Sequence, residues 1–61
     1  MTPKQFQLAA SKTRLKSRAR EAARLVLVEL QQQAEVARAL NINYRAVSRA
    51  VLRIKAEAVQ V

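Results

Sequence analysis

The residues best suited to do chemistry follow an Asn-Ile-Asn sequence at positions 41–43. Arg45 and Arg49 are one helical turn apart, and the same spacing puts Ser48 close to them on a helix. Arginine forms bidentate hydrogen bonds with guanine in the major groove of DNA, and serine can contact a base or a phosphate. This pattern favours recognition of nucleic acid.

The sequence contains few residues of the types that catalyse reactions or bind metals. The chain has no Cys and no His, which excludes a disulfide framework, a thiolate zinc site, a thiol nucleophile and the most common general base. Its acidic residues stand singly among basic ones, so a carboxylate pair or Mg²⁺ site is not expected. These are Glu21, Glu29, Glu35 and Glu57. We predict no enzyme activity, no cofactor and no metal.

Charge narrows the class of partner. The chain has 12 Lys and Arg residues against 4 acidic residues, a net charge of +8. Such a surface most often binds phosphate polymers, and anionic membranes are the second class of partner. No apolar run approaches the ~20 residues that span a bilayer, and the N-terminus lacks the apolar core of a signal peptide. We therefore expect a cytoplasmic protein without a membrane partner.

Two closely spaced helices must position the polar side chains. We expect the first at Gln32–Leu40 and the second from Tyr44 to about Gln60. Between them, Asn41 can adopt the left-handed conformation that often follows a helix end. Ile42 then fills the gap between the helices, and Asn43 is a strong N-cap for the second helix. The sequence therefore predicts a helix-turn-helix motif at about residues 32–54.

A small core supports this motif. Ala37 is expected where the two helices approach most closely, because a larger side chain would push them apart. The residues expected around it are apolar, namely Val36, Leu40, Ile42, Val47 and Val51. The spacing from Ala37 to Asn41 and Val47 is that of helix-turn-helix modules generally, although these usually have Gly where this chain has Asn41. An αα-corner without a ligand is the plainer interpretation.

Two more helices are expected in the first half of the chain. The first begins at a capping box formed by Thr2 and Gln5, with Pro3 in the first helical position. The second is capped by Thr13 or Ser17 and ends at about Val28 or Glu29. Its apolar stripe is Leu15, Ala19, Ala22, Ala23, Val26 and Leu30. We predict an all-α fold of about four helices that forms a single DNA-binding domain over residues 1–61.

Three segments give the sequence a family resemblance. "FQLAA", "ARLVLVE" and "QAEVARALNINYRAVSRAVLRI" resemble the TrfB/KorA family of plasmid transcriptional repressors. The resemblance implies a small helical homodimer that binds a palindromic operator through the second helix of its motif. The chain departs from the family at Leu30 and Asn41, where Gly is usual. A family-style C-terminal dimerisation region is not evident after the motif.

The residues expected to contact DNA lie around the start of the last helix. Asn43, Tyr44, Arg45, Ser48 and Arg49 face the base edges in a helix-turn-helix. Tyr44 can instead contact the backbone or pack, and the two arginines can instead be solvated surface charges.

The remaining candidates are contacts to phosphate. Gln33 resembles the Gln that clamps a phosphate in many such modules, and Arg53 is either a phosphate contact or a surface charge. The basic residues Lys12, Arg14, Lys16, Arg18 and Arg20 form either a flexible segment that adds sequence-independent affinity or a solvated helix face.

The resulting prediction is a sequence-specific repressor of bacterial, plasmid-encoded type that occupies a promoter operator as a homodimer. We expect no small-molecule effector, because no room remains for a domain that would bind one. Leu52 and Val59 are seven residues apart on the outward side of the last helix and are candidates for the dimer seam. Two alternatives remain: a sigma-region-like promoter-recognition module, and a basic amphipathic peptide that binds RNA or membranes.

Overall fold

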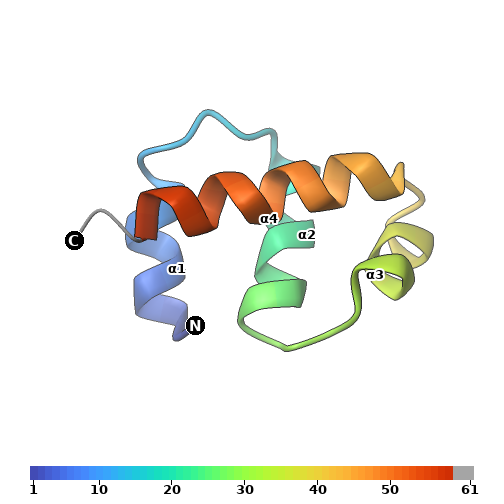
Figure 1. The fold of residues 1–61 in the computed structure, drawn as a ribbon, viewed down its shortest axis with the longest axis horizontal. Helices are drawn as coiled ribbons and strands as arrows, with labels where there is room; N and C mark the ends of the chain where they lie inside the picture. The colour runs from blue at the N-terminus through green and yellow to red at the C-terminus, as the bar shows by residue number, and fades with distance from the viewer. Residues whose placement is uncertain (59–61) are drawn as a thin grey trace.

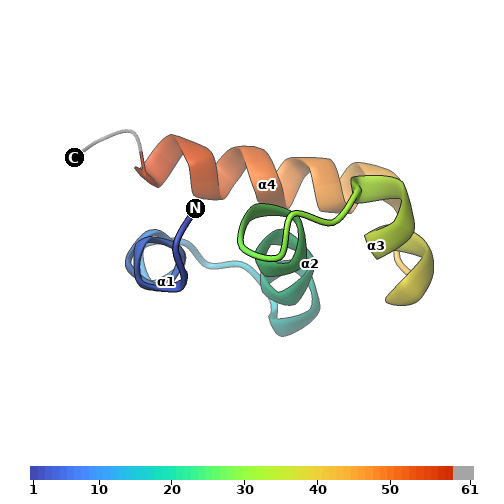
Figure 2. The same cartoon turned by 90° about the horizontal axis from the view of Figure 1, so that it is seen from below.

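Helix α4 (Tyr44–Ala58) runs along the molecule, and three shorter helices pack on one side of it (Figures 1 and 2). These are α1 (Pro3–Ala10), α2 (Ser17–Leu27) and α3 (Gln33–Ala39). The computed structural model describes residues 1–58, and within them it contains four helices and no strand. The predicted all-α fold of about four helices is confirmed.

The core lies between α4 and the three shorter helices. Helix α4 contributes Val47, Ala50, Val51 and Ile54, all at most 2% exposed. Their spacing of three and four residues follows the helical period, so one apolar stripe reaches all three neighbouring helices. The shorter helices contribute Phe6, Ala9, Ala10, Ala22, Ala23, Leu27, Val36 and Ala37. Many of these are alanines, which lets the backbones approach closely.

Helix α1 begins as its sequence predicts. The Thr2 side chain accepts a hydrogen bond from the backbone N–H of Gln5, and the Gln5 side chain accepts one from the backbone N–H of Thr2, both at 3.1 Å. Pro3 occupies the first turn, where its missing N–H costs nothing. The amino group of Met1 donates to the carbonyl of Leu27 at 3.1 Å, which ties the N-terminus to the end of α2.

The predicted start of α2 is wrong. Thr13 is buried, and its hydroxyl donates to the carbonyl of Ala10 at 2.9 Å. The Thr13 hydroxyl therefore hydrogen-bonds to the end of α1 and does not cap α2. The N-cap of α2 is Lys16, without a side-chain hydrogen bond, and Ser17 is already helical. Arg18 and Arg20 are exposed on α2, so the basic residues at 12–20 are not one irregular segment.

Leu30 is not part of the apolar stripe of α2. It is 80% exposed, and its φ of 61° is in the left-handed region. Helix α2 ends at Leu27, and the chain reverses beyond it, with the N–H of Gln31 donating to the carbonyl of Leu25 at 3.0 Å. This turn carries the Leu30 side chain away from the core. Leu27, which the stripe omitted, is buried instead.

The far end of α4 is described as far as Ala58. The predicted end at Gln60, and Val59 of the suggested dimer seam, lie outside the described residues. Leu52 does point outward as expected, with 66% of its surface exposed. Within residues 1–58, no helix is both long and apolar enough to cross a membrane.

Candidate nucleic-acid interface

The turn between α3 and α4 has the conformation that its three residues predict. Asn41 has a φ of 54°. The N–H of Ile42 donates to the carbonyl of Ala37 at 2.9 Å, and the N–H of Asn41 donates to that of Arg38 at 3.2 Å. This pair of bonds is a Schellman motif, which ends a helix through one left-handed residue. Asn at that position bears the conformation at less cost than most side chains.

Asn43 begins the next helix. Its side-chain oxygen accepts a hydrogen bond from the backbone N–H of Arg45 at 2.9 Å, which is the N-cap interaction expected of it. Ile42 is half-buried and packs against the core, so it fills the gap between the helices. Each of the three turn residues thus has the role predicted for it.

The buried sides of α3 and α4 fix their relative position. Val36 and Val47 are completely buried, and Ala37 is 8% exposed. Leu40 is half-buried beside them. Helix α3 lies across the first turns of α4 rather than alongside it (Figures 1 and 2). The two helices and their short turn therefore form a helix-turn-helix unit whose second helix is held by its apolar stripe.

The side of α4 opposite its buried stripe bears the residues that were predicted to contact DNA. Arg45 and Arg49 are exposed one turn apart, and Arg53 follows one turn later. Tyr44 is 53% exposed at the start of the helix, next to the exposed cap residue Asn43. No other helix of the described chain covers this side of α4 (Figure 2). The structure therefore brings these candidates together on one open surface.

Gln33 and Ser48 meet directly. The hydroxyl of Ser48 donates to the side-chain oxygen of Gln33 at 2.6 Å, and both side chains are half-buried. From the sequence, Gln33 and Ser48 were predicted to contact DNA separately, and the hydrogen bond between them was not predicted. No local signal reveals it, because the residues are 15 positions apart and meet only once α3 crosses α4.

The surface of α4 is basic over most of its length. From Tyr44 to Ala56 it contains Arg45, Arg49, Arg53 and Lys55 and no acidic residue; Glu57 is the first. Basic residues clustered along one helix are an electrostatic feature typical of proteins that bind phosphate backbones.

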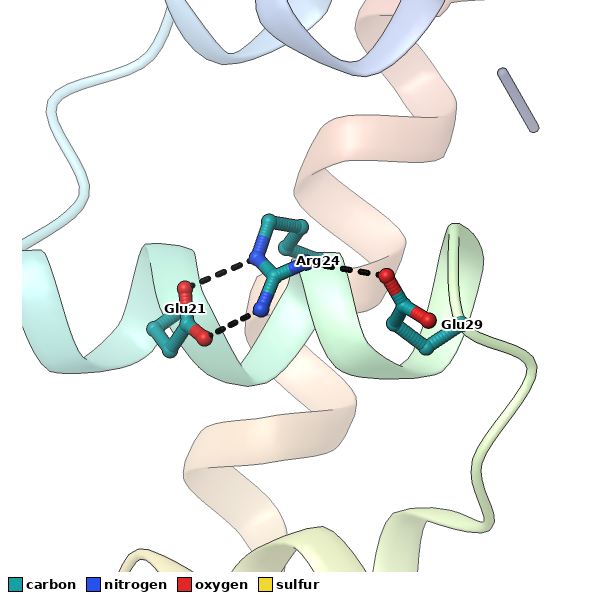
Figure 3. A network of polar contacts seen from close by, with 3 residues as sticks. All are labelled: Glu21, Arg24 and Glu29. Atoms are coloured by element: carbon teal, nitrogen blue, oxygen red, sulfur yellow. Dashed lines mark hydrogen bonds and ion pairs between the residues drawn. The ribbon is translucent and has the colours of Figure 1, made fainter. Parts of the chain in front are cut away.

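Two of the four acidic residues are engaged elsewhere. The Arg24 guanidinium binds Glu21 at 2.6 Å and Glu29 at 3.2 Å on α2 and just beyond it (Figure 3). Hydrogen bonds from Arg24 hold the pKa of the Glu21 carboxyl below its ordinary value, against a smaller opposing effect of burial. These are the ion pairs of the described residues, and none lies on α4. This cluster was not predicted from the sequence, although the three-residue spacing of Glu21 and Arg24 is a signal for it.

Metal chemistry has no evident site among residues 1–58, where no group of three or more His, Cys, Asp or Glu side chains could hold an ion. The exposed side chains of the interface, such as Arg45 and Arg49, offer hydrogen-bond donors and positive charge to a ligand.

The comparisons with known proteins agree with this arrangement. A family model described as the TrfB plasmid transcriptional repressor matches residues 1–60. None of the curated proteins matches the sequence. The match includes every helix and both helices of the helix-turn-helix unit. The chain belongs to the TrfB family of plasmid transcriptional repressors, which are DNA-binding proteins and not enzymes.

Proposed function

We propose that the chain is one DNA-binding domain whose α4 enters the major groove of a promoter operator and reads its sequence. The observation that carries this proposal is the exposure of Arg45 and Arg49, one turn apart, on a helix whose other face is buried. Their side chains can each donate two hydrogen bonds to a guanine. Ser48, on the same part of the helix, adds a hydroxyl near the groove.

Phosphate contacts fix the register of the helix. Gln33 is the first residue of α3, and its side chain contacts Ser48 of α4. Because its side-chain oxygen accepts from Ser48, its amide nitrogen keeps two N–H donors for a phosphate oxygen. Asn43, Tyr44 and Arg53 border the same surface and supply further contacts to the backbone.

The working unit is a homodimer on a palindromic site. One recognition helix reads only a few base pairs, whereas two helices related by a two-fold axis double the site. Half-sites are then one helical turn apart, ~34 Å, and two protomers placed side by side, each 31 Å in its longest dimension, together span that spacing. Repression follows when the bound dimer occupies the promoter, and its extent depends on protein concentration.

Selection from a random-duplex library tests this proposal. The full chain is used to enrich bound duplexes at moderate salt, and the enriched site is then titrated with protein in a sedimentation experiment. We expect an inverted repeat that binds two chains, with affinity that falls steeply as salt rises. Enrichment of no common sequence would contradict specific recognition, and one chain per site would contradict the two-fold model.

A further inference from the structure

Leu52 is the only large aliphatic side chain that the described part of α4 exposes. It is 66% exposed, whereas the other apolar residues of similar size on this helix, Val47, Val51 and Ile54, are at most 2% exposed. Burial in the core therefore does not explain Leu52. Any contact that it makes is with a partner on the open side of the helix.

The spacing of α4 places Leu52 in line with the two arginines. Ser48, Arg49 and Leu52 follow Arg45 at offsets of three, four and seven residues, which is the spacing with which a homeodomain helix reads base edges. A rise of ~1.5 Å per residue puts Leu52 ~10.5 Å beyond Arg45 and close to the same direction. That distance corresponds to about three base-pair steps of ~3.4 Å. One helix face can thus present all four side chains to a single groove.

The charge around Leu52 indicates DNA as its partner. Arg49 and Arg53 flank it on the helix, and both are exposed. If two copies of this face met across a two-fold axis, these like charges would be brought together. A DNA groove is bordered by phosphates, so the same arginines attract it. The base edge that offers an apolar group in the major groove is thymine, through its C5 methyl.

We propose that Leu52 contacts a thymine methyl group in the operator and so contributes to sequence specificity. The inference rests on the proposed function, because it requires α4 to lie in the major groove. It adds an apolar contact to the hydrogen bonds of Arg45 and Arg49, and it assigns Leu52 to DNA rather than to a dimer seam.

The test removes the methyl group from the DNA and the side chain from the protein. Each thymine of the enriched duplex is replaced singly by deoxyuridine, which lacks only the C5 methyl. Binding is measured by fluorescence anisotropy for the wild type, for Leu52→Ala and for Leu8→Ala. Leu8 is a matched control, since it is 60% exposed but lies on α1. Both variants should melt like the wild type, because neither leucine is buried.

We expect one thymine in each half-site at which deoxyuridine weakens wild-type binding about fourfold, the effect of losing one buried methyl-sized group. Leu52→Ala should bind the thymine duplex and the deoxyuridine duplex equally well. Leu8→Ala should lose affinity on the deoxyuridine duplex as the wild type does. A response of Leu52→Ala equal to that of the wild type would overturn the inference. So would an enriched site without thymine, or a Leu52→Ala protein that sediments as a monomer where the wild type is dimeric. If the wild type enriches no sequence at all, the proposed function itself fails.

Discussion

The hydroxyl of Ser48 donates a hydrogen bond to the side-chain oxygen of Gln33 at 2.6 Å and so connects the first residue of α3 to the second turn of α4. In the proposed function, Gln33 binds a phosphate and Ser48 faces the groove. On that proposal, the bond links the helix that sets the register on DNA to the helix that reads the bases. In this arrangement the Gln33 oxygen is the acceptor, which leaves both N–H groups of its amide available as donors.

Substitutions at Gln33 and Ser48 should separate the contribution of this contact to stability from its contribution to DNA affinity. Gln33→Glu keeps an acceptor for Ser48 but replaces the amide donors with a negative charge. We expect its stability to stay close to that of the wild type while its affinity for DNA falls. Ser48→Ala should lower the free energy of unfolding by ~0.5–1.5 kcal/mol, the typical value of one hydrogen bond. Urea denaturation and anisotropy titrations measure the two effects. Wild-type affinity in Gln33→Glu would show that the amide does not contact phosphate.

Ala37 should tolerate no larger side chain. It is 8% exposed where α3 packs against α4, so Ala37→Leu should destabilise the fold by ~1–3 kcal/mol through overpacking. Ala39→Leu is the matched control, since Ala39 is exposed on the same helix and Leu is a good helix former. Thermal melts followed by circular dichroism compare the two. Equal melting temperatures for both variants would show that α3 and α4 are not closely packed at Ala37.

The parts of this fold that follow from local rules could be predicted from the sequence. The capping box at Thr2 involves neighbours three residues apart, and the left-handed Asn41 follows from its position after a helix end. Val47 and Val51, which were expected in the core, lie one helical turn apart on the buried side of α4. These features depend on a few consecutive residues, and tertiary packing did not override them.

The features that the sequence did not reveal depend on how separate segments meet. Thr13 resembles an N-cap for α2, yet its hydroxyl is taken by the end of α1. Leu30 fits the stripe of α2 only if the helix continues, and the helix stops three residues earlier. For the interface, Arg45 and Arg49 were expected close together because they are one helical turn apart. The bond between Gln33 and Ser48 was not, because it requires the crossing of two helices.

Leu30 holds a conformation that glycine would adopt at lower cost. Its φ of 61° is in the left-handed region, where the Cβ of an L-residue costs roughly 1–2 kcal/mol. Its side chain is 80% exposed, so its removal loses little packing. We expect Leu30→Gly to stabilise the protein by ~0.5–1 kcal/mol, after the entropy that glycine adds to the unfolded chain.

The control for Leu30 is its neighbour Gln31, which is also exposed but is not among the residues with positive φ. Gln31→Gly gains no relief from the left-handed region and should be neutral or destabilising. Chemical denaturation of the three proteins provides the comparison. A Leu30→Gly protein no more stable than Gln31→Gly would contradict the cost assigned to this turn.

Acid should weaken the cluster around Arg24. Hydrogen bonds from Arg24 lower the pKa of Glu21 from its ordinary value of 4.5. A carboxylate with a lowered pKa in the folded state stabilises the protein fully above its unfolded pKa, and this contribution is lost as the pH falls through the folded value. Unfolding of Glu21→Gln should therefore depend less on pH below about 4.5 than that of the wild type.

The size of this acid effect should be small, because the Arg24 and Glu21 side chains are 38% and 44% exposed and water screens the pair. Glu57→Gln is the control, since Glu57 is not in the Arg24 cluster. Denaturant titrations at several pH values between about 3 and 6 measure the difference. Parallel curves for the wild type and Glu21→Gln would mean that the pair does not contribute in solution.

Arg49 should contribute to the preference of the protein for an operator over an unrelated duplex. A bidentate contact to guanine is worth ~1–3 kcal/mol of discrimination, so the preference of Arg49→Ala for the enriched site over a scrambled duplex should be about 5- to 150-fold smaller than that of the wild type. Arg18→Ala also removes one positive charge, but from α2 and not from the face of α4 that is proposed to contact bases. It should weaken binding to both duplexes by the same factor, because a phosphate contact is independent of sequence.

Anisotropy titrations of both duplexes at two salt concentrations give the ratio of affinities for each protein. Both arginines are exposed, so neither change should alter the melting temperature, and a loss of binding cannot then be assigned to unfolding. The decisive quantity is the ratio, because charge removal lowers both affinities while loss of readout lowers only the one for the enriched site. An Arg49→Ala protein that retains the wild-type ratio would show that Arg49 does not read a base.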